Sequence, residues 1–289
     1  MTSRTETIRA GFRAALSAPE PVLAPLALDA LTARLAESAG YGAVYLSGGA
    51  LGYAHAVSEA LLSLTELADT AHHLTARTGL PLIVDGGVGF GDPVHVHRTI
   101  GMIEATGAAA IEIEDQVAPK RASHHRHIEH LISTEEMVAK IAVAVEARTD
   151  PDFLLIARTG AVSNESWEAA IERCSAYREA GADILMLFPD SWDRWAEARQ
   201  RLDAPLAGMT MFDRRTPEQW AELGWALIID PMTGQVVAFD AVRQAYAGYL
   251  AEGRSGQDRR HLAGVYDELA TFAGMAELYA IEDRTTESG

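Results

Sequence analysis

One short phrase recurs along the chain and constrains its fold more than any other feature. In each copy a helical segment ends at a glycine and an apolar stretch follows at once. The glycines are Gly40, Gly107, Gly181 and Gly224, and the stretches after them include YLSGG, AAIEIED, ILMLFP and ALIIDP. Glycine readily adopts the left-handed conformation that closes a helix. Each phrase therefore predicts a helix followed by a strand.

Further apolar stretches lie between these phrases. They are PVLAPLA near the start of the chain, LIVDGG, LLIARTG and APLAGMT, which brings the total to eight predicted strands that alternate with helices. Continuously apolar strands in such an alternation form a parallel sheet that helices cover. Eight units within 289 residues favour a single α/β domain, a (β/α)8 barrel of the TIM type, over the alternative of a doubly wound open sheet.

An additional helical stretch follows the eighth unit, at about residues 257–284. Its apolar positions recur at helical spacing and comprise Leu262, Val265, Leu269, Phe272, Met275 and Leu278. Surplus apolar positions need a surface to cover. We expect a neighbouring subunit to provide it.

The composition excludes several classes of partner. A formal charge of −17 repels both nucleic acid and an anionic membrane surface. Cys174 is the only cysteine, so no disulfide can form within the chain, and this fits a reducing compartment. No apolar run approaches the roughly 20 residues that span a bilayer. We therefore expect a cytoplasmic protein.

The ends of the predicted strands carry the polar side chains that barrels of this type use for chemistry. Glu112 and Glu114 are two residues apart in a strand and so share a face. Two carboxylates confined inside a barrel need a cation or shifted pKa values. Arg158, also in an apolar strand, needs a carboxylate partner from the protein or from a substrate. A purely structural Glu–Arg pair remains the alternative.

A polar loop follows the fourth strand. It contains Lys120, Arg121, His124, His125, His127 and His130. The histidine spacing fits no familiar metal-ligand pattern, so a solvated loop and a catalytic loop both remain open. Together with Asp85, Glu112 and Glu114, the loop predicts a site for a divalent cation and a small anionic substrate.

Several strings together resemble the isocitrate lyase/phosphoenolpyruvate mutase superfamily, and most of all its methylisocitrate lyase and 2,3-dimethylmalate lyase branch. They are YLSGG, VDGGVGFGDP, IEIEDQVAPKRASHH, LISTEEMVAKI, IARTGA, AAIERCSAYREAGAD and FPD, and the likeness runs from about Pro21 to Arg284. The resemblance implies a barrel whose last helices are exchanged within a homodimer or homotetramer. It also implies a Mg²⁺ or Mn²⁺ site that acts on small 2-oxo or 2-hydroxy carboxylic acids, by C–C cleavage or decarboxylation through an enolate.

The resemblance and the strand ends together define a predicted site. The substrate-binding residues are Tyr45, Ser47, Gly48, Gly49, Arg158, Asp190 and Thr210. The metal residues are Asp85, Glu114 and Glu112, and the catalytic residues are Arg158 with Lys120, Ser123 and His124 of the mobile loop.

The chain departs from the superfamily pattern at the chemical centre. The lyases have Lys-Lys/Arg-Cys-Gly-His in the loop, whereas this loop has Ala122 in place of the cysteine that transfers a proton. The second aspartate of the metal strand is Gly87, an acid expected in the loop after the second strand is Ser58 with Glu59 beside it, and an expected asparagine is Gly208.

These departures leave three functions open. The first is a lyase in which His124, Ser123 or a water molecule replaces the thiol. The second is a different, metal-independent chemistry in specialised metabolism. The third is a non-catalytic binding homologue.

Overall fold

The computed structural model describes residues 2–126 and 128–286, so His127 of the predicted loop lies outside the described residues. Eight parallel strands form one sheet in the order β1-β8-β7-β6-β5-β4-β3-β2. They are β1 Val22–Pro25, β2 Val44–Leu46, β3 Leu82–Asp85, β4 Ala110–Glu114, β5 Leu154–Arg158, β6 Ile184–Met186, β7 Leu206–Met209 and β8 Leu227–Asp230.

The two ends of the sheet, β1 and β2, meet where the barrel closes. A parallel bridge joins Leu26 to Tyr45, and the N–H of Ala27 donates to the carbonyl of Tyr45 at 2.9 Å. The sheet is therefore a nearly closed barrel. The predicted (β/α)8 fold is confirmed, and the open doubly wound sheet is excluded.

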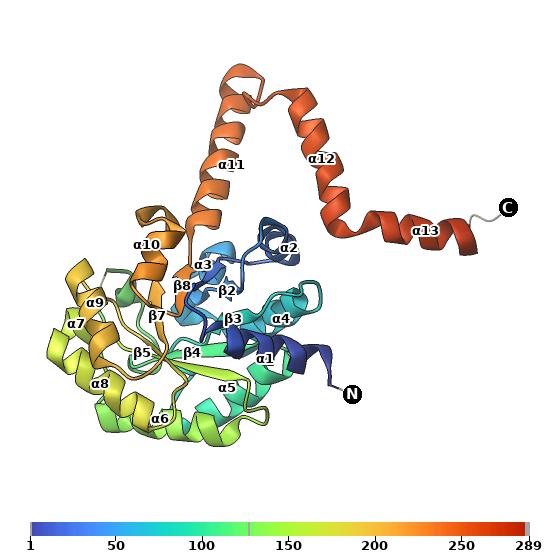
Figure 1. Ribbon diagram of the computed structural model, residues 1–289. Helices are drawn as coiled ribbons and strands as arrows, with labels where there is room; N and C mark the ends of the chain where they lie inside the picture. Colours follow the sequence, from blue (N-terminus) through green and yellow to red (C-terminus); the bar gives the residue numbers. More distant parts are fainter. Residues whose placement is uncertain (1, 127, 287–289) are drawn as a thin grey trace. The chain divides into compact units, whose positions relative to one another are not determined.

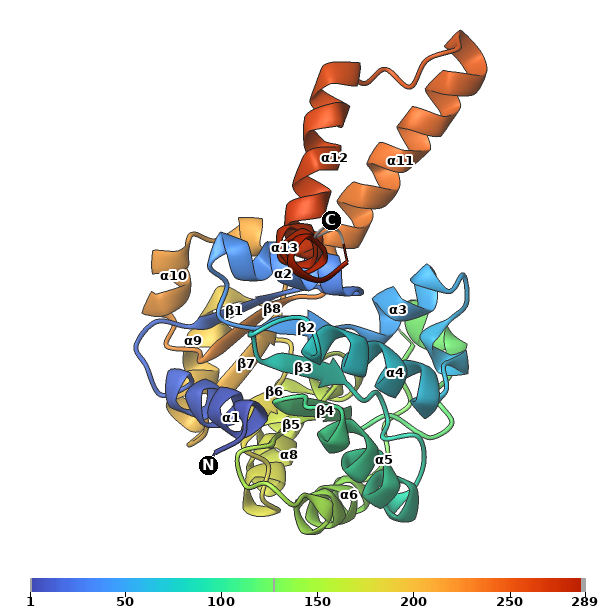
Figure 2. The ribbon, with the colours of Figure 1, turned by 90° about the vertical axis from the view of Figure 1, so that its right-hand side faces the viewer.

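Helices surround the outside of the sheet, as Figure 1 and Figure 2 show. In chain order they are α1 Arg4–Ala15, α2 Ala30–Ala39, α3 Gly48–Ala54, α4 Leu64–Thr75, α5 Pro93–Ala105, α6 Thr134–Ala147, α7 Ala161–Asn164, α8 Trp167–Glu179, α9 Trp192–Arg201 and α10 Pro217–Glu222. Three short 3₁₀ turns lie in loops, namely η1 Glu59–Leu61, η2 Ala122–Arg126 and η3 Phe212–Arg214.

The glycines of the repeated phrase close helices as predicted. Gly40, Gly107, Gly181 and Gly224 all have positive φ, between 66° and 107°. This left-handed conformation carries little steric cost for glycine and lets the chain turn directly into the next strand.

Two apolar layers explain why the acidic strand ends point inward. Residues of one face of each strand, such as Ala110 of β4, pack in the barrel interior, where Phe12 of α1 joins them. Residues of the other face, such as Ile111 and Ile113, pack against the outer helices. Because side chains alternate along a strand, Glu112 and Glu114 share the inward face with Ala110.

The chain divides into two compact units, residues 1–233 and 234–289. The second unit consists of α11 Thr233–Glu252, α12 Arg259–Ala273 and α13 Met275–Thr285. None of these helices has a buried residue among those described. Exposed apolar side chains on them include Phe239, Tyr246, Leu250, Tyr266 and Tyr279. Exchange of these helices between subunits remains a prediction.

No helix in the described part of the chain is both long enough and apolar enough to cross a bilayer.

Candidate active site

Carboxylates from β3 and β4 meet an arginine from β5 at the carboxyl edge of the barrel. The strand register places Asp85 beside Glu112, and Glu114 beside Arg158. Asp85, Glu112 and Glu114 are all buried. Removing several charges from water is costly unless they are paired, so their partners decide what this edge can do.

Glu112 has a partner on each oxygen. Arg158 donates from Nη1 to Oε1 at 2.9 Å, and the Tyr45 hydroxyl donates to Oε2 at 2.7 Å. The Arg158 guanidinium also lies over the Phe188 ring, 4.8 Å from its centroid. Burial raises the pKa of Glu112 to about 7, and the charge of Arg158 only partly opposes this.

Glu114 lies between two cations. Nη2 of Arg158 is 3.4 Å from Oε2, and the Lys120 ammonium is 2.6 Å from Oε1. Burial alone would raise the pKa of Glu114, but Arg158 and Lys120 lower it.

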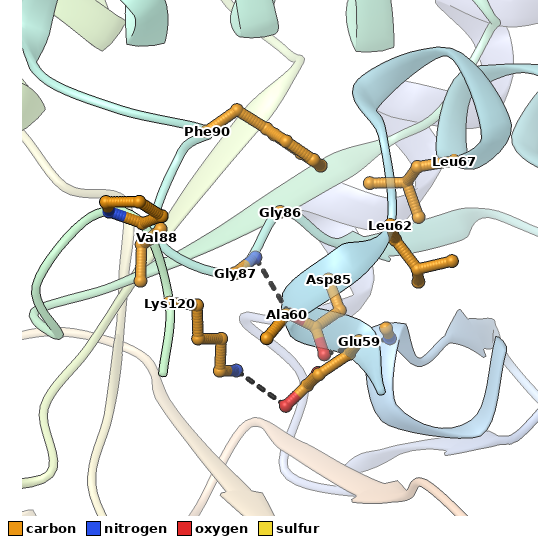
Figure 3. Close-up of a pocket in the computed structure, with 12 residues that line it drawn as sticks. Glu59, Ala60, Leu62, Leu67, Asp85, Gly86, Gly87, Val88, Phe90 and Lys120 are labelled. Atoms are coloured by element: carbon orange, nitrogen blue, oxygen red, sulfur yellow. Dashed lines mark hydrogen bonds and ion pairs between the residues drawn. The ribbon is translucent and has the colours of Figure 1, made fainter. Parts of the chain in front are cut away.

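Glu59, in the turn after α3, links the loop to the barrel. Its Oε1 is 2.7 Å from the Lys120 ammonium and forms an ion pair with Nε2 of His124 (Figure 3 shows the contact with Lys120). Burial would raise the pKa of Glu59, but the hydrogen bond from His124 and the charge of Lys120 lower it to about 2. Lys120 and His124 of the loop therefore contact the site through ion pairs with Glu59.

Asp85 differs from its neighbours because its hydrogen-bond donors are backbone groups. Oδ1 accepts from the N–H of Gly87 at 2.9 Å, and Oδ2 accepts from the N–H of Gly48 at 3.0 Å. Burial, followed by the charge of Glu59, raises the pKa of Asp85. A side chain at Gly48 would come within 3.1 Å of Glu59, so glycine lets the two acids approach.

A cavity of about 170 Å³ opens beside Asp85. Its lining residues are Gly48, Glu59, Ala60, Leu62, Leu67, Asp85, Gly86, Gly87, Val88, Phe90, Pro119 and Lys120. Asp85, Glu59 and Lys120 make one part of the wall charged (Figure 3), and the leucines, Val88 and Phe90 make the rest apolar.

The donor set fits a hard divalent cation bound through one protein carboxylate. Within residues 2–126 and 128–286, no three His, Cys, Asp or Glu side chains are arranged to hold an ion by themselves. Mg²⁺ commonly keeps several waters and takes one or two carboxylates plus substrate oxygens. Asp85 lines the cavity and its pKa is raised. A cation bound beside it would stabilise its negative charge.

Other predicted residues lie elsewhere or have local partners. The Ser47 hydroxyl caps α3 by accepting from the N–H of Ala50, and Gly48 and Gly49 begin that helix. The Ser123 hydroxyl donates to the carbonyl of Ile128 at 3.4 Å, within the loop itself.

Asp190 and Thr210 line a second cavity, together with Phe188, Met209 and Arg214, and not the one beside Asp85. The Asp190 side chain is 60% exposed and pairs with Arg194 at 2.6 Å. The structure thus gathers the predicted metal residues, Tyr45, Arg158, Lys120 and His124 into one cluster and leaves Asp190 and Thr210 outside it.

No other cysteine takes the place of the missing thiol, and the position of the missing asparagine is crowded. Cys174 lies fully buried among the outer helices, and burial raises the pKa of its thiol. A Cβ at Gly208 would lie 2.4 Å from the Trp195 ring, so a larger residue cannot fit there. Trp195 itself packs against Trp225, with ring centroids 4.2 Å apart.

Sequence reasoning missed Glu59 as a member of the site. The available signal was the acid expected after the second strand, where Ser58 stands with Glu59 beside it. Only the short turn η1 decides that the side chain of Glu59, and not that of Ser58, faces Lys120.

An eight-stranded parallel barrel that gathers charged side chains at its carboxyl edge has the architecture of the (β/α)8-barrel enzymes, whose active sites lie at that edge. The family model of phosphoenolpyruvate phosphomutase matches residues 12–250. The chain belongs to this family, within the isocitrate lyase/phosphoenolpyruvate mutase superfamily, and the predicted resemblance is confirmed.

Two relatives support the methylisocitrate lyase and 2,3-dimethylmalate lyase branch, and a solved structure supports the superfamily. A probable 2-methylisocitrate lyase 1 of Corynebacterium glutamicum is 40% identical over 95% of this chain and 90% of its own length. The 2,3-dimethylmalate lyase of Eubacterium barkeri is 34% identical over 94% of each chain. The structure of a phosphonopyruvate hydrolase complex with oxalate and Mg²⁺ superimposes with a TM-score of 0.87 at 31% identity, covering 96% of this chain and 98% of the other.

Proposed function

We propose that this protein is a carbon–carbon lyase that acts on a small 2-oxo or 2-hydroxy carboxylic acid. The observation that carries the proposal is the cluster of Asp85, Glu112, Glu114, Lys120 and Arg158 at the barrel edge, beside a cavity. The relatives named above include lyases of such acids.

Arg158 is positioned to bind the carboxylate of the substrate. Its guanidinium pairs with Glu112 and Glu114 and is held over the Phe188 ring, so its orientation is fixed before a ligand arrives. A planar guanidinium binds a carboxylate through two parallel hydrogen bonds. The remaining carboxylates then repel the substrate's charge less than they would without Arg158.

Cleavage of the C–C bond of a 2-hydroxy acid requires two proton movements. A base removes the hydroxyl proton, the bond electrons move to the carbon that becomes the enolate, and an acid later protonates that carbon. Lys120 supplies positive charge beside the cavity, and His124, which pairs with Glu59, is a loop group that can exchange a proton. We assign the role of the missing thiol to His124.

A Mg²⁺ or Mn²⁺ ion fits this proposal as the cofactor. Asp85 would hold it directly, and Glu114 and Glu112 would bind its waters. When bound, the ion supplies stabilisation for the negative charge that develops on the enolate oxygen.

The position of Lys120 favours a second candidate, metal-independent chemistry on the same scaffold. Its ammonium lies between Glu59 and Glu114, 2.7 Å and 2.6 Å from their oxygens, and so already places a positive charge among the carboxylates.

Thermal unfolding with Mg²⁺ and oxalate tests the proposal. Ligands that bind only the folded protein stabilise it, so we expect the two together to raise Tm more than either alone. Arg158→Ala should abolish the oxalate-dependent part, whereas Arg194→Ala, which removes a half-exposed arginine that pairs with Asp190 outside the cluster, should not.

A shift with oxalate that does not depend on a metal would favour the second candidate. Absence of turnover with every C4–C7 2-oxo or 2-hydroxy acid would point to a binding homologue and contradict both.

We also propose a homodimer or homotetramer located in the cytoplasm. The exposed apolar side chains of α11, α12 and α13 support a second copy as the surface that covers them, by exchange of these helices. Light scattering after size-exclusion chromatography measures the assembly directly. The single, fully buried cysteine is compatible with a reducing compartment.

A further inference from the structure

We propose that the apolar part of the cavity beside Asp85 binds an apolar branch of the substrate, so that the substrate is a small carboxylic acid carrying a branched alkyl group. The inference rests on the proposed function, because it needs the acid group to be bound by Arg158 and by a cation at Asp85, with the alkyl branch extending from there into the cavity. Nothing in the names of the relatives assigns a role to this wall.

The cavity has two chemically different parts. Asp85, Glu59 and Lys120 provide the charged part. Leu62, Leu67 and Phe90 extend into the cavity on the side away from Lys120, as Figure 3 shows, and Val88 completes the apolar lining. Ligand sites combine an apolar lining with a few polar groups that fix orientation.

The loop that carries Val88 and Phe90 is held on both sides by hydrogen bonds. The N–H of Gly86 donates to the carbonyl of Glu112 at 2.8 Å, and the N–H of Glu114 donates to the carbonyl of Gly87 at 2.8 Å. The buried Lys140 ammonium donates to the carbonyl of Val88 at 2.9 Å. The apolar wall is therefore built before a ligand binds.

Phe90 occupies an unusual backbone conformation. Its φ is 61°, in the left-handed region that bulky residues rarely adopt, and the ring lines the cavity. The Thr99 hydroxyl fixes the preceding residue by donating to the carbonyl of Gly89 at 3.0 Å. Strained backbone of this kind is found where a side chain is held for a function.

Position 87 contributes no charged side chain to the cavity. A Cβ at Gly87 would meet nothing within 4 Å, so a side chain there would have open space. The superfamily pattern has an aspartate at this position, whereas this chain has no group there that could bind water or a cation.

The cavity size limits the ligand. An apolar cavity of about 150 Å³ admits a molecule the size of benzene, and this cavity measures about 170 Å³. Water is a poor occupant of the apolar part, because a buried water needs two to four polar partners. Since the charged part takes up some of this volume, the apolar part has room for a branched alkyl group of about four carbons.

Isothermal calorimetry in the presence of Mg²⁺ tests the inference with three probes: oxalate, pyruvate and 4-methyl-2-oxopentanoate. Each buried methylene contributes roughly a fourfold gain in affinity. We expect 4-methyl-2-oxopentanoate to bind at least about tenfold more tightly than pyruvate.

Two neighbouring leucines provide a matched pair of variants. Leu62 lines the cavity, whereas Leu61 is 74% exposed and lies outside it. Leu62→Ala should reduce the preference for the branched acid about fivefold and leave oxalate binding unchanged, and Leu61→Ala should change neither. Phe90→Gly, which removes the ring and tolerates positive φ, is a second variant should Leu62→Ala unfold.

The outcomes separate the two proposals. Equal affinities for pyruvate and 4-methyl-2-oxopentanoate, with oxalate still bound, would overturn this inference and leave the proposed function intact. A preference that survives both Leu62→Ala and Phe90→Gly would overturn it as well. Failure of all three acids to bind would remove the proposed function and this inference together.

Discussion

Two adjacent residues, Glu114 and Asp115, belong to two different buried clusters of charged side chains. The clusters differ in how completely their carboxylates are paired. Asp115 accepts hydrogen bonds from Thr159 at 2.6 Å, Tyr177 at 2.8 Å, the N–H of Gly160 at 3.1 Å and Arg173 at 3.3 Å. Each of its oxygens has at least one donor. We call this the outer cluster, because Arg173 and Tyr177 belong to α8 outside the barrel.

The inner cluster consists of Glu59, Asp85, Glu112 and Glu114 with Lys120, Arg158 and His124. Four carboxylates face three basic groups, and Asp85 accepts hydrogen bonds only from two backbone N–H groups among the described residues. Full pairing is typical of an acid that stabilises the fold, whereas surplus negative charge beside a cavity is typical of an acid that awaits a ligand.

The largest expected effect is a loss of stability after a substitution in the outer cluster. Asp115→Ala removes a buried acid and leaves Thr159, Tyr177 and the N–H of Gly160 without an acceptor, whereas Arg173 keeps Glu165. The free energy of unfolding should therefore fall by about 3 kcal/mol. Urea unfolding measures it. Asp115→Asn, which retains an acceptor, should cost less, and a loss below about 1 kcal/mol for the alanine variant would show that the outer cluster is not structural.

Asp85→Asn should instead affect ligand-dependent stability. At one hundred times Kd, Mg²⁺ with oxalate should stabilise the native chain by about 2.7 kcal/mol, and the variant should lose this gain. Without ligands its stability should change by less than about 1 kcal/mol, because relief of repulsion from Glu59 offsets one lost hydrogen bond. A strong loss of ligand-free stability would place Asp85 with the outer cluster.

Arg158→Lys tests the geometry of the inner cluster with its charge retained. A lysine cannot form two parallel hydrogen bonds with a carboxylate. Oxalate affinity, measured by calorimetry, should fall about tenfold, the equivalent of one charged hydrogen bond. Unchanged affinity would indicate that Arg158 serves Glu112 and Glu114 alone.

Ser123→Ala should have the smallest effect. The hydroxyl bonds the Ile128 carbonyl at 3.4 Å, so its loss should change kcat less than about twofold, as for most surface substitutions. A tenfold loss would instead make Ser123, and not His124, the replacement for the thiol.

The barrel could be predicted from the sequence because its signals are local. Gly40 and Gly181 close helices through a conformation that glycine alone adopts freely. The continuously apolar stretches after them are typical of strands in a parallel sheet that helices cover. Ser133 and Glu136, three residues apart, form a capping box at the start of α6, which is another local signal.

The site could be predicted from the sequence only for residues in strands, because alternation along a strand determines the side to which each side chain points. Asp85, Glu112, Glu114 and Arg158 meet because alternation along β3, β4 and β5 points them inward. Glu59 lies in a turn whose orientation depends on Lys120 and His124, residues far away in the sequence. The separation of Asp190 from Asp85 depends likewise on side-chain packing around two cavities, which no local pattern encodes.

The contact between position 208 and Trp195 limits how this protein can be converted back toward its relatives. Since a Cβ at position 208 overlaps the indole, introducing asparagine there demands a smaller residue at position 195 beforehand. Shrinking that indole alone would in turn leave Trp225 without its neighbour. Either single change lowers the stability of the fold, so such a conversion would have to pass through a less stable intermediate or acquire both changes at once.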